Sequence, residues 1–210
     1  MEFETELDRV LPADLPNRDR VIGKAVQHLQ MIVSANEYMN LTRITNPQEA
    51  AVKHIYDCVA PWRYFAKGKR VLDAGTGAGF PGIPLALVLP AVRFTLAEST
   101  GKKARFVETV VDALELPNVQ VFPDRAESFS SARDLDVITA RAVAPISRIC
   151  DLFGRSLKAG VRLLLFKGPE VETEFEEAKR NRVEATVLYR YELPDGFGSR
   201  TLVQLKAQGR

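Results

Sequence analysis

The stretch VLDAGTGAGFPGIPLAL (Val71–Leu87) sets four glycines and two prolines between two apolar runs. The first run follows Arg70 and is typical of a buried strand. The second run is typical of a helix that begins beside the glycines, with prolines in its opening turn. Glycines at every second position exceed what a tight turn requires. The stretch therefore predicts a strand–loop–helix unit whose bare backbone lies against a ligand.

The residues after this stretch alternate between β-rich and helical patterns, which indicates a parallel sheet with helices on both faces. We expect strands at 70–74, 92–97, 119–122, 135–140 and 161–167, and helices near 82–89, 101–114, 145–158 and 170–181. The last two β-rich runs, EATVLYRYEL and SRTLVQLKA, are separated only by PDGFG, which is too short for a crossover helix. The sequence thus predicts an α/β, Rossmann-like fold with a mostly parallel sheet and an antiparallel last strand.

Residues 1–65 have helical patterns, and we expect them to form a small N-terminal extension to a sheet domain over 66–210. Between Arg18 and Met39 the apolar residues recur at helical spacing. A second helix is expected in NPQEAAVKHIYDCVAPW, with Pro47 in its first turn and Pro61 near its end.

The composition is that of an ordinary soluble globular protein, with 46% hydrophobic and 27% charged residues. A net charge of +2 and a pI near 8.5 permit an RNA partner but do not indicate one by themselves. No apolar run approaches the roughly 20 residues that span a bilayer, and the acidic start MEFETELDRV has no signal-peptide pattern. We expect a cytoplasmic monomer with no membrane segment and no metal site. Cys58 and Cys150 are expected to be buried free thiols.

The glycine loop matches two ligand patterns. Gly77, Gly79 and Gly82 spell G-x-G-x-x-G, the dinucleotide fingerprint. Asp73, Gly75, Gly77 and Gly79 spell D-x-G-x-G-x-G, the loop of enzymes that use S-adenosylmethionine. Glycine spacing alone does not separate the two ligands.

Three features favour S-adenosylmethionine. A carboxylate at Asp73 repels a pyrophosphate, whereas a sulfonium cation tolerates it. Pro81 and Pro84 remove two amide donors that a pyrophosphate would use. The antiparallel final hairpin also differs from the all-parallel dinucleotide sheet. Glu98, about 20 residues after the loop, suits the ribose hydroxyls of either ligand.

Ligands of open α/β sheets bind beyond the carboxyl ends of the strands, which collects further candidates from several loops. Glu127, in DRAES after the third strand, is either a ligand contact or a surface carboxylate. Arg141, in ARAVAP after the fourth, suits the methionine carboxylate, an RNA phosphate, or a salt bridge to a neighbouring acid. Basic residues also gather at this edge and predict either an RNA-contacting rim or solvated helix ends; they are Lys102, Lys103, Arg105, Lys167 and Arg200, besides Arg141.

The residues also restrict the methyl acceptor. Methylation at a pyrimidine carbon needs a cysteine nucleophile, and neither Cys58 nor Cys150 follows a strand end. The Asp/Asn-Pro-Pro-aromatic loop typical of exocyclic-amine methylation is absent after the fourth strand. A ring nitrogen such as guanine N7 has a free lone pair and requires only alignment with the methyl group. We therefore assign no general base.

With these residues in place, the chain resembles the RsmG (GidB) family of bacterial 16S rRNA guanine-N7 methyltransferases. The resemblance runs from about Asn40 to the C-terminus and rests on NLT, HIYDC, DAGTGAGFPGIPLA, ES…GKK, TARAVAP and FKG in the family's order. The continuation GFPGIPLA is far more specific than the glycines. Cys58 and Glu98 depart from the family, which often has serine and aspartate there.

The resemblance implies a class I methyltransferase fold, S-adenosylmethionine as donor, and 16S rRNA or the small subunit as partner. Its acceptor is N7 of guanine 527, in conventional 16S numbering, in the 530 loop. Carried over, the family's cofactor contacts are Gly75, Phe80, Ala126, Glu127 and Arg141, with Glu98, Ser99 and Thr100 at the ribose and adenine side. Two other hypotheses stay open: a methyltransferase of a small molecule or protein, and an NAD-binding sensor or cofactor-binding scaffold.

Overall fold

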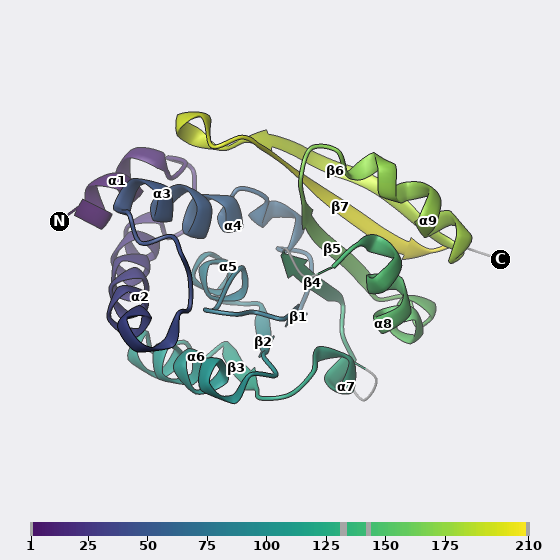
Figure 1. Ribbon diagram of the computed structural model, residues 1–210, viewed down its shortest axis with the longest axis horizontal. Coiled ribbons are helices and arrows are strands. Elements are labelled where there is room, and N and C mark those ends of the chain that lie inside the picture. The colour runs from purple at the N-terminus through teal and green to yellow at the C-terminus, as the bar shows by residue number, and fades with distance from the viewer. Residues whose placement is uncertain (1, 131–133, 142–143, 209–210) are drawn as a thin grey trace.

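The structure is a computed structural model that describes residues 2–130, 134–141 and 144–208, apart from the side chain of residue 177. Its centre is a seven-stranded sheet in the order β3-β2-β1-β4-β5-β7-β6 (Figure 1). The strands are β1 (Arg70–Ala74), β2 (Arg93–Ala97), β3 (Val119–Phe122), β4 (Val137–Arg141), β5 (Arg162–Lys167), β6 (Val183–Glu192) and β7 (Ser199–Ala207). β1 to β5 are parallel, and β7 runs antiparallel to both of its neighbours. The predicted α/β fold and its antiparallel last strand are confirmed.

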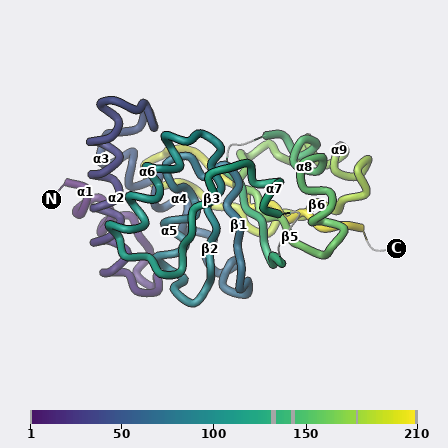
Figure 2. The backbone as a smooth tube through the Cα atoms, turned by 90° about the horizontal axis from the view of Figure 1, so that it is seen from below, coloured from purple at the N-terminus to yellow at the C-terminus, as the bar shows by residue number. Residues whose placement is uncertain are grey.

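Helices cover both faces of the sheet. The α-helices are α1 (Glu2–Val10), α2 (Arg18–Met39), α3 (Pro47–Ala50), α4 (Asp57–Val59), α5 (Gly82–Val88), α6 (Gly101–Ala113), α7 (Ala126–Ser130), α8 (Ile146–Lys158) and α9 (Phe175–Arg180). Short turns of other helix types are η1 (Ala51–Tyr56), η2 (Trp62–Tyr64), η3 (Val171–Glu174) and η4 (Pro194–Gly196). Figure 2 shows the N-terminal helices at one end of the molecule and α8 and α9 toward the other.

Alternation along β1 divides the interior into two apolar clusters. Val71 points into the cluster formed with α1, α2, α5 and α6, whereas Leu72 and Ala74 point into the cluster formed with α7 and α8. The first cluster also contains Leu7, Leu29 and other residues of the N-terminal helices. The helices of residues 1–65 therefore share one core with the sheet. None of the helices in the described part of the chain has both the length and the apolar character to cross a membrane.

The structure refines four sequence expectations. The stretch 1–65 contains a separate first helix, α1, and the expected second helix is divided between α3, η1 and α4. The π-helical turn η1 arises because the N–H of Asp57 donates to the carbonyl of Val52, five residues earlier. The predicted loop DRAES leads into the one-turn helix α7, which begins at Ala126, and the helix expected at 170–181 is a 3₁₀ turn followed by the shorter α9.

Candidate active site

The first half of the glycine loop is open. Gly75 and Gly77 adopt φ values of 72° and 63°, the left-handed region that favours glycine. The N–H groups of Gly75 and Thr76 both donate to the carbonyl of Ala97, at 3.0 Å each, and so fix the loop to the end of β2. A methyl group added at Gly77 would meet no heavy atom within 4 Å. The bare backbone at Gly77 therefore faces space that a ligand can occupy, and Gly75 beside it is exposed.

The second half of the loop is packed against the protein itself. A methyl group at Gly79 would overlap Ile83 Cδ1, and one at Gly82 would overlap Leu96 and lie 2.8 Å from Asp73 Oδ2. Gly79 is buried, unlike the exposed Gly75. Gly82 is required by the close approach of α5 to β1 and β2, and Gly79 packs against Ile83 of α5 and His28 of α2. Gly79, expected at the cofactor, thus has a packing role in the structure.

Asp73 supports the loop from inside the strand. Its Oδ2 accepts hydrogen bonds from Thr76 Oγ1 at 2.6 Å and from the N–H of Gly82 at 2.9 Å. Complete burial raises the pKa of this carboxyl to about 6, and the two hydrogen bonds oppose that rise. Its Oδ1 is buried and accepts no hydrogen bond from the described residues. One oxygen therefore holds the loop together, and the other is an acceptor still to be satisfied.

Glu98 lies at the end of β2 and faces the open half of the loop. Its Oε2 accepts from the N–H of Gly77 at 3.1 Å, and its Oε1 accepts from the N–H of Thr100 at 2.7 Å. The residue is 8% exposed, whereas Ser99 and Thr100 beside it are exposed. A carboxylate oxygen can accept more than one hydrogen bond, so both oxygens retain capacity for hydroxyl donors. The ribose position predicted for Glu98 stays a prediction.

The ring of Phe80 packs away from the open side of the loop. It stacks between His28 and His54, with ring centroids 4.9 and 4.6 Å apart, and the residue is 6% exposed. Burial lowers the pKa of His28 to about 4 and that of His54 to about 3, so both rings are neutral at pH 7. Of the expected cofactor contact at Phe80, only the backbone is available.

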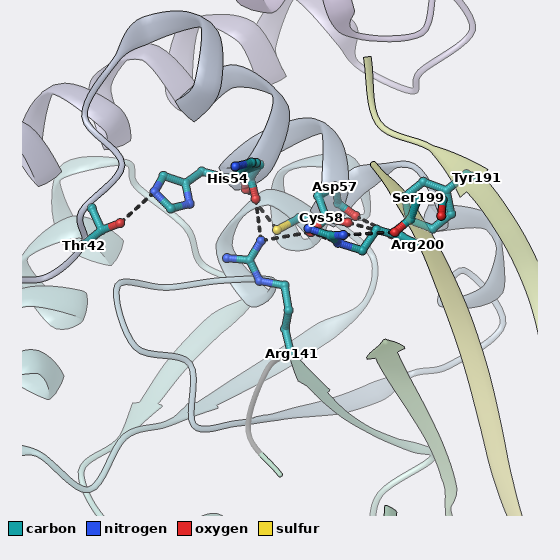
Figure 3. A network of polar contacts seen from close by, with 9 residues as sticks. Thr42, His54, Asp57, Cys58, Arg141, Tyr191, Ser199 and Arg200 are labelled. Atoms are coloured by element: carbon teal, nitrogen blue, oxygen red, sulfur yellow. Dashed lines mark hydrogen bonds and ion pairs between the residues drawn. The ribbon is translucent and has the colours of Figure 1, made fainter. Parts of the chain in front are cut away.

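Arg141 belongs to a buried polar network rather than to an open loop, as Figure 3 shows. Its Nη1 donates to the carbonyl of Lys53 at 2.6 Å and lies 3.4 Å from Asp57 Oδ2. Asp57 is 3% exposed and also accepts from the Tyr191 hydroxyl at 2.8 Å, and Arg200 Nε lies 3.6 Å from the same carboxylate. The salt bridge that was one alternative for Arg141 is thus present in the structure. Asp57 links Arg141, an expected cofactor contact, to Arg200, an expected RNA contact.

The sequence reasoning gave Asp57 no role. One signal was available: it sits in HIYDC, one of the stretches that carry the family resemblance. What the sequence did not show is the π-helical turn that precedes it, or that β4 and β7 would each bring an arginine to it.

The two candidate cofactor residues after the third strand, Ala126 and Glu127, lie in α7. Ala126 is buried at the start of α7, and Glu127 is half-buried, with Oε1 3.8 Å from Arg125 Nη1. In the loop ARAVAP, residues 142–143 lie outside the described residues.

The expected basic rim separates into two groups. Lys102, Lys103 and Arg105 lie in the first turns of α6, where Lys102 and Arg105 are exposed. Lys167, at the end of β5, pairs with Glu174 at 2.9 Å and donates to the carbonyl of Ala144 at 2.9 Å. Lys167 and Arg200 therefore already have acidic neighbours, whereas the α6 group has the character of a free cationic surface.

Both cysteines are free and buried, as predicted. The thiol of Cys58 donates to the carbonyl of His54 at 3.0 Å, and burial raises the pKa of Cys58 to about 12 and that of Cys150 to about 11. Neither is therefore a thiolate nucleophile at neutral pH. Across residues 2–130, 134–141 and 144–208, we find no group of three or more His, Cys, Asp or Glu placed to hold a metal ion.

Comparison with known proteins gives a consistent result. The sequence family described as "GidB: rRNA small subunit methyltransferase G" matches residues 21–192. A protein of Solibacter usitatus named ribosomal RNA small subunit methyltransferase G is 54% identical over 98% of this chain and all of its own length. A protein of the same name from Carboxydothermus hydrogenoformans is 37% identical over 86% of this chain and 80% of its own.

The fold recurs in solved methyltransferase structures. An O-methyltransferase from Bacillus cereus, solved in complex with SAH, has a TM-score of 0.58 to this chain. The match covers 86% of this chain and 91% of that one, at 18% identity. At this identity the likeness shows the fold alone, and the predicted class I methyltransferase fold is confirmed.

Proposed function

The chain belongs to the rRNA small subunit methyltransferase G family, and from that premise we propose that it methylates N7 of one guanine, guanine 527, in the 530 loop of 16S rRNA. It is an S-adenosylmethionine-dependent rRNA methyltransferase. The observation that carries the proposal is the family match over residues 21–192, together with the 54% identity to a relative over its whole length.

The residues at the open half of the loop fit S-adenosylmethionine. Gly77 leaves free space at the backbone beside the exposed Gly75, and Glu98 offers two carboxylate oxygens to the ribose hydroxyls. Ser99 and Thr100 follow at the adenine side, and Ala126 and Glu127 complete the candidate set from α7. The unsatisfied Oδ1 of Asp73 adds negative charge beneath the loop, which suits a cationic ligand and opposes a pyrophosphate.

When bound, S-adenosylmethionine supplies an electrophilic methyl group on a sulfonium. The protein's task is then to hold the guanine in line with that group, because N7 carries a lone pair and no proton has to be removed. Arg141 and Arg200, both fixed by Asp57, lie at the strand ends where such positioning has to occur. The buried, protonated thiol of Cys58 offers no competing thiolate nucleophile.

Further proposals concern the setting of the reaction. We propose that the enzyme acts as a monomer in the cytoplasm, on 16S rRNA or the small ribosomal subunit. We also propose that residues 1–65 form a helical extension to the methyltransferase domain at 66–210. Because that extension shares a core with the sheet, its removal should unfold the domain rather than only weaken RNA binding.

A methyl-transfer assay tests the proposed function. Labelled S-adenosylmethionine is supplied with intact small subunits, with protein-free 16S rRNA, or with no RNA, and the product is digested and mapped by mass spectrometry. We expect one 7-methylguanine in an RNA-containing reaction and no transfer without RNA. Transfer that ignores RNA and moderate salt would instead indicate a small-molecule or protein acceptor. Calorimetry with NAD against S-adenosylhomocysteine tests the dinucleotide alternative.

A further inference from the structure

A groove of about 820 Å³ lies between α2 and α6 and has no part in the cofactor site described above. Twelve residues line it, seven from α2 and five from α6, and none of them is acidic. Its polar lining includes Gln27 and Gln30 from α2 and Lys102 and Arg105 from α6, and Tyr38 stands near the end of α2. The rest of the lining is largely apolar and includes Met31, Met39 and Phe106, so the groove combines two cations and two amides with an apolar, partly aromatic surface.

Helices α2 and α6 run antiparallel, so the last turn of α2 lies beside the first turn of α6. Lys24, near the start of α2, lies 3.6 Å from Glu115, just after the end of α6. The end of α2 that carries Tyr38 is therefore the end that meets Lys102 and the first turn of α6. Figure 1 shows α2 and α6 side by side. Lys102 follows two residues after Thr100, whose N–H donates to Glu98, so the groove begins beside the proposed cofactor loop.

The side chains at this end are available to a ligand. Tyr38 is 75% exposed, the highest value among the exposed large hydrophobic residues in the described chain. Lys102 and Arg105 are exposed and form no ion pair with the described residues. Their position in the first turns of α6 also places them where the helix dipole favours an anion.

A single-stranded RNA segment fits this combination better than a protein does. Aromatic side chains stack on bases, and basic side chains neutralise the phosphates between them. The amides of Gln27 and Gln30 can donate and accept at base edges. An acidic peptide would use the two cations but would leave the exposed aromatic ring without a matching role.

We propose that the groove between α2 and α6 binds single-stranded nucleotides that flank the target guanine, with one base stacked on Tyr38 and the backbone phosphates at Lys102 and Arg105. The inference rests on the proposed rRNA methyltransferase function and extends it. It assigns α2, in the N-terminal extension, a share in substrate recognition.

The test measures the affinity of the protein for RNA by fluorescence anisotropy. One probe carries the target guanine in its stem–loop with its single-stranded flanks, and a second probe lacks the flanks. We expect Tyr38→Ala to weaken binding of the flanked probe about tenfold, since stacking on one base carries an effect of this order. Tyr38→Phe, which keeps the ring, should stay within about twofold of the parent. The shorter probe should not distinguish the variants.

Charge variants provide the second arm. Lys102→Ala and Arg105→Ala should each lower the slope of log affinity against log salt by about one, because each removes one phosphate contact. Lys24→Ala removes a positive charge from α2, outside the groove, and should leave that slope unchanged. Affinity for S-adenosylhomocysteine, measured by calorimetry, reports whether a variant has disturbed the cofactor site.

The outcomes separate the two proposals. Unchanged RNA affinity in Tyr38→Ala, in an enzyme that still methylates rRNA, overturns the groove assignment and leaves the proposed function intact. A wild-type protein that transfers no methyl group to rRNA overturns both. A change of mass in solution on Tyr38→Ala, seen by light scattering, would identify a second copy of the chain as the occupant and would overturn the RNA assignment.

Discussion

Both halves of the glycine loop are rich in glycine, but the surroundings that favour glycine differ between the two halves. At Gly77 the space beside the backbone is empty, Gly75 is exposed, and Glu98 is held by backbone N–H groups at the loop's edge. At Gly79 and Gly82 the space is filled by Ile83, Leu96 and the protein's own core. One half leaves free space beside its backbone, and the other is filled by side chains of the protein itself.

The comparison explains why the loop matched two motifs. The dinucleotide pattern needs Gly79 and Gly82 for close helix–strand packing, and any tightly packed strand–loop–helix unit shares that requirement. The discriminating information lies in the open half and in the charges around it. Asp73 accepts a hydrogen bond from Gly82 in the packed half and keeps its other oxygen unsatisfied.

The largest expected effect is a change in the free energy of unfolding with pH, and it arises in the packed half. His28 and His54 stack there on Phe80, and Asp73 accepts a hydrogen bond from Gly82. Both folded pKa values, about 4 for His28 and about 3 for His54, lie below the ordinary value of 6.5. The unfolded chain therefore binds more protons below pH 6.5, so the stability associated with the neutral rings is complete above that pH and is lost as the pH falls. Asp73 acts in the opposite direction, because its pKa of about 6 lies above 3.8.

Between pH 7 and pH 5 the two histidines should together lower the free energy of unfolding by about 4 kcal/mol, and Asp73 should offset about 1 kcal/mol of this. Urea titrations at the two pH values measure the difference. His28→Gln, which cannot titrate, should show roughly half the histidine contribution. A stability that is flat across this range would contradict the neutral, buried state of the two rings.

A side chain in the open half should remove the cofactor while leaving the fold. Gly77→Val places a branched side chain in the empty space and at a positive φ, so we expect affinity for S-adenosylhomocysteine to fall at least about 100-fold, which corresponds to about 2.7 kcal/mol. Gly75→Val should act in the same way. Calorimetry gives the affinity and circular dichroism checks the fold. A folded variant that still binds would show that the ligand lies elsewhere.

A smaller change in the packed half should show the reverse pattern. Gly82→Ala forces a methyl group against Leu96 and Asp73 and should destabilise the protein by about 2 kcal/mol. The molecules that remain folded should bind S-adenosylhomocysteine within about threefold of the parent. Gly23→Ala is the matched control: it lies exposed inside α2 with no heavy atom within 4 Å, and should stabilise by about 0.5–1 kcal/mol. If folded Gly82→Ala loses affinity for S-adenosylhomocysteine, the packed half also supports cofactor binding, and the two halves do not differ in role.

The fold followed from the sequence because its signals are local. Alternating strand and helix patterns place all five parallel strands, and the short PDGFG connection requires the antiparallel final pair. The break in the second N-terminal helix was not predictable in this way, because η1 differs from an α-helix only in the spacing of its hydrogen bonds, as in the bond from the N–H of Asp57 to the carbonyl of Val52. Propensities do not distinguish that turn from an α-helix.

The placement of a candidate site residue was predictable where it depends only on the strand that the residue follows. It was not predictable where the side chain is held by residues from other helices or strands. Glu98 and the open glycines lie as their positions after β1 and β2 require. Phe80 and Arg141 were expected at the ligand, but His28 and His54 stack on the ring of Phe80 and Asp57 binds the guanidinium of Arg141. These partners come from the N-terminal helices, more than 20 residues away in sequence, and only the folded structure brings them together.

Glu98 provides the smallest and most specific test of the open half. Replacing it with glutamine keeps the size but removes the charge and one acceptor, so the ribose hydroxyls lose a charge-assisted hydrogen bond. Affinity for S-adenosylhomocysteine should fall about tenfold, which corresponds to about 1.4 kcal/mol. Glu108→Gln, an exposed acid on α6, should leave the affinity unchanged.

A double comparison shows whether that loss belongs to the ribose. An analogue of S-adenosylhomocysteine without ribose hydroxyls should bind wild-type protein about as weakly as Glu98→Gln binds the parent ligand. The same analogue should not bind Glu98→Gln more weakly still, because the interaction is already absent. Additive losses would mean that Glu98 only braces Gly77 and Thr100 and that the ribose binds another group. The open half would then resemble the packed half, with its carboxylate serving the loop's own structure.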